Sequence, residues 1–132
     1  MNKINQINTA LEQLFESGNM SIVESIFSDN YTLHHGDKAY GGHIFIKKFT
    51  KQLRKALPDL KILKVEFLSQ TSNMVTWQRS FSGTHKVAMK SIPPSNKKIK
   101  WHEIVVSRFE DDKIVEEWLV SDLAFQMMLK QG

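Results

Sequence analysis

The stretch that decides the fold is Lys113-Ile-Val-Glu-Glu-Trp-Leu-Val-Ser-Asp122. It predicts a strand that ends at an acidic residue and leads into a short closing helix. Because successive side chains of a strand point to opposite faces, alternate residues share one face. These are Ile114, Glu116, Trp118 and Val120. We therefore expect the Glu116 carboxylate among apolar side chains, with Asp122 at the exit of the strand.

Residues 75–89 predict the opposite wall of the same structure. The odd positions are Val75, Trp77, Arg79, Phe81, Gly83, His85, Val87 and Met89. The even positions are polar or charged apart from Ala88, so one face of this strand is expected to be solvated and the other buried. The stretch is long for a single strand, and Gly83 permits a bend or bulge. A sheet bent at this point would enclose a space.

The remaining elements place helices before a run of strands. Apolar periodicity predicts a helix over 4–14, a short helix capped by a Ser21–Glu24 box, and a helix over 46–57 that ends before Pro58. Strands are expected at 31–35, 60–67 and 99–109, and a last helix after 122. The strand at 99–109 has no clear phase, which leaves the facing of His102 and Glu103 open. This order is typical of an α+β fold.

The composition is that of a compact globular protein. The 132 residues fit a single domain over 1–132, with 41% hydrophobic and 24% charged residues. The chain has no cysteine, which excludes disulfides and thiolate chemistry. No apolar run is long enough for a signal peptide or for a membrane span of about 20 residues. We therefore expect a cytoplasmic protein with no membrane partner.

The positive charge does not predict a nucleic-acid partner. The net charge is +4, and much of the excess falls on one expected helix, in residues 47–55. Binders of single-stranded nucleic acid normally interleave stacking aromatics with such charges, and this helix offers only apparent core residues. No glycine-rich phosphate loop, no metal-ligand spacing among the five histidines and no G-x-S-x-G motif is present. We therefore expect no cofactor and no metal.

Four polar residues are the candidates for chemistry, three on the expected inner faces and one at the exit of the last strand. Arg79 on an apolar face needs a partner, and we expect Glu116; the pair either orients a ligand or only fixes the sheet register. His85 is either a core histidine or a donor to a developing oxyanion. Asp122 either caps the closing helix or acts as a general base. The tryptophans, Trp77, Trp101 and Trp118, are core residues first and ligand-stacking walls second.

Four segments together carry a family resemblance. They are Ala56-Leu-Pro-Asp-Leu60, Gly83-Thr-His85, Ile92-Pro-Pro-Ser-Asn-Lys97, and Lys113–Trp118 leading to Asp122. Over most of its length the chain resembles the SnoaL-like polyketide cyclase or ester cyclase group of the NTF2-like superfamily. The resemblance implies a cone, in which N-terminal helices close a strongly bent antiparallel sheet around a central pocket. It also implies a homodimer formed through the sheet.

The resemblance further implies a function. Characterised polyketide cyclases use an aspartate after the tryptophan strand as the acid/base of an intramolecular aldol ring closure, without a cofactor. By that likeness, Asp122 would take a C–H proton next to a carbonyl group of an apolar small molecule, and His85 would polarise the oxygen. The residues expected to bind the substrate are Arg79, Glu116, Trp118, Trp77, Phe81, Trp101, Tyr31 and His35.

Two other readings stay open. One is a non-catalytic module that binds a small ligand or dimerises. The other is an enzyme like ketosteroid isomerase or epoxide hydrolase. A shared fold does not decide among them, because function depends on the site.

Overall fold

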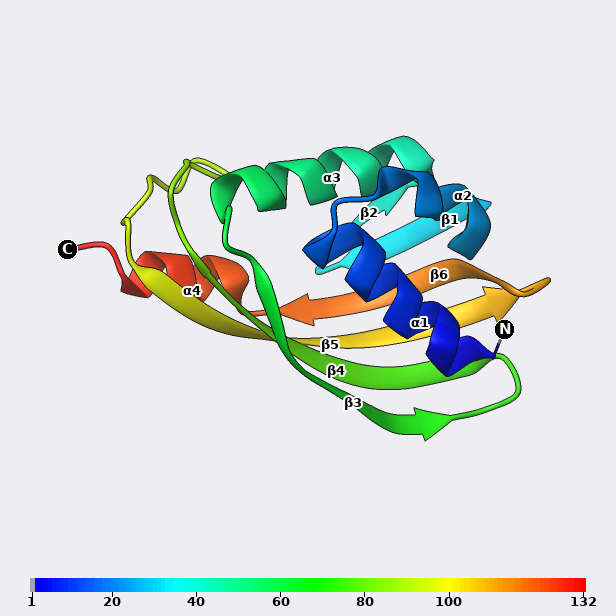
Figure 1. The fold of residues 1–132 in the computed structure, drawn as a ribbon. Coiled ribbons are helices and arrows are strands. Elements are labelled where there is room, and N and C mark those ends of the chain that lie inside the picture. The colour runs from blue at the N-terminus through cyan, green and yellow to red at the C-terminus, as the bar shows by residue number, and fades with distance from the viewer. Residues whose placement is uncertain (1) are drawn as a thin grey trace.

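Helices cover one face of a curved six-stranded sheet in the computed structural model, which describes residues 2–132 (Figure 1). The helical elements are α1 (Lys3–Leu11), the π-helical turn η1 (Glu12–Glu16), the 3₁₀ turn η2 (Met20–Ile22), α2 (Val23–Ile26), α3 (Gly42–Ala56) and α4 (Leu123–Leu129). The strands are β1 (Phe27–His35), β2 (Lys38–Gly41), β3 (Lys61–Gln70), β4 (Met74–Thr84), β5 (Lys98–Glu110) and β6 (Lys113–Ser121). The predicted α+β class, a bent sheet closed by N-terminal helices, is confirmed.

The sheet has the order β2-β1-β6-β5-β4-β3. Four of its neighbouring pairs are antiparallel, but β1 runs parallel to β6, which differs from the expected antiparallel sheet. A hairpin forces its two strands to be antiparallel, whereas β1 and β6 are separated by most of the chain and have no such constraint. Strand β1 therefore pairs with β6, the edge strand of the β3–β6 meander, in a parallel orientation.

A β-bulge at Val115 changes which residues of β6 face the helices. Arg108 pairs with Glu116, yet the next residue, Phe109, pairs with Ile114, so β6 has one extra residue here. An extra residue shifts the alternation by one position. Ile114 and Glu117 are consequently both buried, at 1% and 9% exposure. The prediction that Glu116 shares the apolar face with Ile114 is therefore wrong.

The helix predictions hold better than those for the turns. The apolar periodicity correctly predicted α1 with η1, and also α3, which ends at Ala56 ahead of Pro58. The predicted capping box is wrong, because the side chain of Asn19, not Ser21, accepts the backbone N–H at the start of η2. This arises because an asparagine two residues before a free N–H closes an Asx turn.

Strand β4 is shorter than predicted. It ends at Thr84, after which residues 85–97 leave the sheet and pass beside the end of α3. A Cβ atom at Gly83 would lie 2.9 Å from two side-chain carbons of Leu57, so the glycine allows α3 to approach the sheet closely. Among the described residues, no helix is both long enough and apolar enough to cross a membrane.

Candidate functional site

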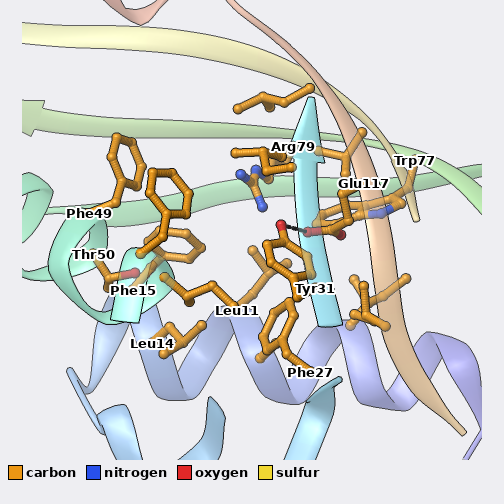
Figure 2. A pocket seen from close by; sticks show the side chains of 18 residues that line it. Leu11, Leu14, Phe15, Phe27, Tyr31, Phe49, Thr50, Trp77, Arg79 and Glu117 are labelled. Carbon is orange, nitrogen blue, oxygen red and sulfur yellow. Dashed lines mark hydrogen bonds between the residues drawn. The ribbon is translucent and has the colours of Figure 1, made fainter. Parts of the chain in front are cut away.

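Two adjoining pockets, the inner chamber and the outer chamber, lie between the helices and the inner face of the sheet. The inner chamber, of about 70 Å³, is bounded by α1, η1, α3 and strands β1, β4, β5 and β6 (Figure 2). Its lining is mostly aliphatic and aromatic, and the polar exceptions are Tyr31, Thr50, Arg79 and Glu117. The outer chamber, of about 420 Å³, lies toward α4 and the 85–97 loop. Four residues line both chambers and form the boundary between them, here called the waist: Leu33, Phe45, Phe49 and Leu119.

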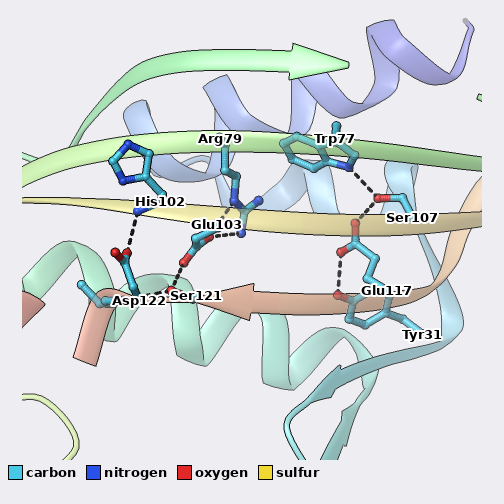
Figure 3. A network of polar contacts seen from close by, with 10 residues as sticks. Tyr31, Trp77, Arg79, His102, Glu103, Ser107, Glu117, Ser121 and Asp122 are labelled. Atoms are coloured by element: carbon cyan, nitrogen blue, oxygen red, sulfur yellow. Dashed lines mark hydrogen bonds and ion pairs between the residues drawn. The ribbon is translucent and has the colours of Figure 1, made fainter. Parts of the chain in front are cut away.

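Glu117 is the centre of a buried hydrogen-bond network in the inner chamber. Its carboxyl group accepts from the Tyr31 hydroxyl at 2.7 Å and from the Ser107 hydroxyl at 2.5 Å, and Trp77 Nε1 donates to Ser107 Oγ at 3.0 Å (Figure 3). Burial raises the pKa of Glu117, although its two hydrogen bonds and Arg79 act in the opposite direction. Burial, and then the charge of Glu117, raise the pKa of Tyr31 well above its ordinary value. The inner chamber thus holds the Tyr31 hydroxyl group and the Glu117 carboxyl group among apolar side chains.

Arg79 forms a second network, with Glu103. Its Nε and Nη2 atoms both lie 2.7 Å from Glu103 Oε1, and Ser121 Oγ donates to Glu103 Oε2 at 2.7 Å (Figure 3). The guanidinium lies over the rings of Phe15, Trp77 and Phe81, at 5.1 to 5.3 Å from their centroids. The predicted inward position of Arg79 is therefore right, but its partner is Glu103 and not Glu116. The register explains this, since Arg79 lies directly opposite Glu103 on β5.

Glu116 and Trp118 lie on the outer face of the sheet. Glu116 is hydrogen-bonded to His34 at 2.6 Å and to Arg108 at 3.0 Å, which lower the pKa of its carboxyl group. Trp118 stacks on His34 at 5.2 Å and is 38% exposed. The bulge at Val115 puts both side chains outside the cone, so the expectation that they bind a ligand within the pocket is wrong.

Asp122 lies at the end of β6 but does not line either chamber. Its Oδ1 accepts from the backbone N–H of His102 at 2.7 Å, and its Oδ2 accepts from Gln126 Nε2 at 3.2 Å. It lines a third hollow, of about 490 Å³, together with residues of β3, β4, β5 and β6. This hollow shares Arg79 with the inner chamber, and Glu103 and Ser121 with the outer one. These contacts join the β6–α4 junction to β5. The acid/base role of Asp122 stays a prediction.

His85 is completely buried and lies outside the lining of both chambers. Its backbone exchanges hydrogen bonds with Lys97 and Asn96, where the chain has left β4. Neither nitrogen of its ring has a hydrogen-bond partner among residues 2–132. Trp101 and Phe81 stack at 5.2 Å behind Arg79 and belong to the core rather than to the cavity wall.

The structure therefore brings together part of the predicted site. Tyr31, Trp77 and Arg79 line the inner chamber, and His35 lines the outer one. Glu117 and Ser107 are not among the site residues predicted from the sequence, and the facing of Glu103 was left open there. The facing of Glu103 could have been predicted from an Arg79 partner on the neighbouring strand, whereas that of Glu117 depends on the bulge. Within residues 2–132, no group of three or more His, Cys, Asp or Glu side chains could hold a metal ion.

Comparison with known proteins gives one family match and several proteins of similar structure. A family model described as SnoaL-like polyketide cyclase matches residues 5–129. A SnoaL-like polyketide cyclase from Agrobacterium tumefaciens has a similar structure, with a TM-score of 0.78, 20% identity and full coverage of both chains. No curated protein matches the chain in sequence.

Two Streptomyces proteins have the same fold under different names. AclR from Streptomyces galilaeus, a candidate hydroxylase, has a TM-score of 0.77 and 19% identity, over 98% of this chain and 96% of its own. IdmH from Streptomyces antibioticus, a candidate polyketide cyclase, has a TM-score of 0.74 and 22% identity, over 98% of each chain. At these identities the likeness establishes the fold alone.

Replacing Arg79 by methionine should destabilise the protein by about 3 kcal/mol, because it leaves the Glu103 carboxylate buried without its partner. The Arg79→Met/Glu103→Leu double variant should regain most of that loss, since it removes both charges. Urea unfolding of the wild type, both single variants and the double variant measures the coupling. Additive effects of the two substitutions would contradict the buried ion pair.

Proposed function

Because the chain belongs to the SnoaL-like polyketide cyclase family, we propose that it is a cofactor-independent enzyme of the polyketide cyclase type, acting on an apolar small molecule that bears a carbonyl group. The observation that carries this proposal is an apolar cavity whose sheet wall holds a buried carboxyl group beside an arginine. Apolar walls with a few convergent polar groups are typical of small-molecule sites. The aliphatic and aromatic lining would hold the carbon skeleton, and the polar groups would orient the oxygen.

The two chambers suit a ligand with two parts. The inner chamber admits only a few atoms near Tyr31 and Glu117, whereas the outer chamber has room for a larger portion. The outer lining includes the charged residues Lys48, Lys90 and Glu103, with His35. A polar substituent at the outer end of the ligand could therefore be solvated there.

One observation favours the non-catalytic alternative, a module that only binds a small ligand. The two residues predicted to be catalytic, Asp122 and His85, do not line the chambers. Under the catalytic proposal, Asp122→Asn abolishes turnover of an identified substrate while the fold is retained. If that variant keeps full activity, the Asp122 carboxylate has only a structural role, at the junction of β6 and α4.

We also propose a homodimer through the outer face of the sheet. Ile104 and Val120 lie opposite each other on β5 and β6, and they are 46% and 71% exposed. Trp118, also on this face, adds a partly exposed aromatic ring. A second copy related by a two-fold axis would cover the same apolar residues on both chains.

Binding to the cavity is tested with 2-acetylnaphthalene, an apolar ketone. Amide chemical-shift changes should concentrate on the chamber linings. Leu119→Trp, which fills the waist, should weaken binding by at least about tenfold, equivalent to 1.4 kcal/mol. The matched control is Leu68→Trp, since Leu68 is an exposed leucine on β3 that should leave binding unchanged. Shifts confined to the outer face, or unaltered binding by Leu119→Trp, would contradict the proposal.

The dimer is tested by light scattering after size-exclusion chromatography. The wild type should have the mass of two chains, and Val120→Asp should have that of one, because a charge introduced beside Ile104 must be desolvated on association. Leu129→Asp, at an exposed position on α4, is the control and should remain dimeric. A monomeric wild type at high concentration would argue against this interface.

A further inference from the structure

The direction of each hydrogen bond around Glu117 follows from the chemistry of the groups. An indole N–H can only donate, so Ser107 Oγ accepts from Trp77. The Ser107 hydroxyl has one hydrogen, and the residue is completely buried, so that hydrogen requires an acceptor. Glu117 Oε2, at 2.5 Å, is that acceptor. Trp77 and Ser107 therefore fix Oε2 as the oxygen that receives a hydrogen bond.

A proton on Glu117 would consequently reside on the other oxygen, Oε1. This atom lies 2.7 Å from the Tyr31 hydroxyl oxygen. When Glu117 is ionised, Tyr31 must donate its hydrogen to Oε1. When Glu117 is neutral, Oε1–H donates to the Tyr31 oxygen, and the tyrosine hydrogen is free to point into the inner chamber that Tyr31 lines.

The surroundings of Glu117 raise the pKa of its carboxyl group, which shifts the equilibrium toward the neutral form. The titratable and charged groups that act on it are Tyr31 on β1, Arg79 on β4 and Glu103 on β5. Arg79 favours the carboxylate, but its guanidinium is already paired with Glu103, whose own charge disfavours ionisation. Burial has the largest effect on Glu117 and raises its pKa, while the raised pKa of Tyr31 keeps the phenol neutral.

We propose that Tyr31 and neutral Glu117 together form a hydrogen-bond donor for the acceptor oxygen of the ligand, with Ser107 and Trp77 fixing its direction. This inference rests on the proposed function in one respect, that an apolar molecule occupies the cavity. It identifies the ligand class as molecules whose inner end carries a carbonyl or comparable acceptor oxygen. Ionisation of Glu117 withdraws the donor, so the site distinguishes acceptor ligands from apolar ones only while Glu117 holds its proton.

A matched pair of ligands isolates this donor. 2-Acetylnaphthalene carries a carbonyl oxygen that 2-ethylnaphthalene lacks, and neither compound titrates. Their dissociation constants are measured by calorimetry from mildly acidic to alkaline pH. The wild type should prefer the ketone by about tenfold at the acidic end, as expected for one hydrogen bond of about 1.4 kcal/mol. The preference should disappear as the pH rises and Glu117 ionises.

Two nearly isosteric variants separate the roles. Tyr31→Phe should have no ketone preference at any pH. Glu117→Gln should keep the preference at every pH, because its amide nitrogen donates to Tyr31 while its amide oxygen accepts from Ser107. The control is Glu116→Gln, which alters the neighbouring outward carboxyl group and should behave as the wild type does. Circular dichroism of each variant verifies the fold.

The outcomes distinguish this inference from the proposed function. The proposed Tyr31–Glu117 donor is contradicted if Tyr31→Phe keeps the preference for the ketone. It is also contradicted if Glu117→Gln keeps the pH dependence of the wild type. Equal binding of both compounds by the wild type would also overturn it, while leaving the cavity as a ligand site. If neither compound binds, the proposal that an apolar molecule occupies the cavity is refuted, and the proposed hydrogen-bond donor is refuted with it.

Discussion

The β-bulge at Val115 is the constraint on which the polar interior of the cone depends. Without it, strict alternation from Ile114 would turn Glu116 inward and Glu117 outward. With it, Glu117 reaches Ser107 and Tyr31, and Glu116 reaches His34 and Arg108. One inserted residue thus assigns two adjacent, chemically identical side chains to opposite environments, a buried site and a solvated ion-pair cluster.

Burial of a carboxyl group is costly unless its hydrogen-bonding capacity is satisfied. The cone meets this requirement twice, with different solutions. Glu117 has hydroxyl partners, which suits a group that can hold a proton, whereas Glu103 is paired with the Arg79 guanidinium. The inward residues of β5, which include Glu103, Val105 and Ser107, alternate polar and apolar groups along the wall. A ligand would therefore meet isolated polar groups in an apolar surround.

Much of the fold could be predicted from the sequence because its determinants are local. Helical periodicity and the proline at position 58 defined α3, and the alternation in 75–84 correctly placed Trp77, Arg79 and Phe81 inward. The site was harder, because it depends on pairing between strands. A partner for Arg79 could be expected, but choosing Glu103 over Glu116 requires the β4–β5 register. The bulge has no local marker, such as a glycine in β6, and the parallel β1–β6 pairing joins distant segments.

The measurement that most directly tests the role of the bulge is a ¹³C NMR titration of the carboxyl carbons of Glu116 and Glu117 in one sample. An ordinary glutamate pKa is 4.5. The midpoint should lie above that value for Glu117, which is buried, and below it for Glu116, which is paired with His34 and Arg108. The reverse order, with Glu116 raised and Glu117 lowered, would mean that β6 continues without a bulge and that the cone holds a different carboxyl group.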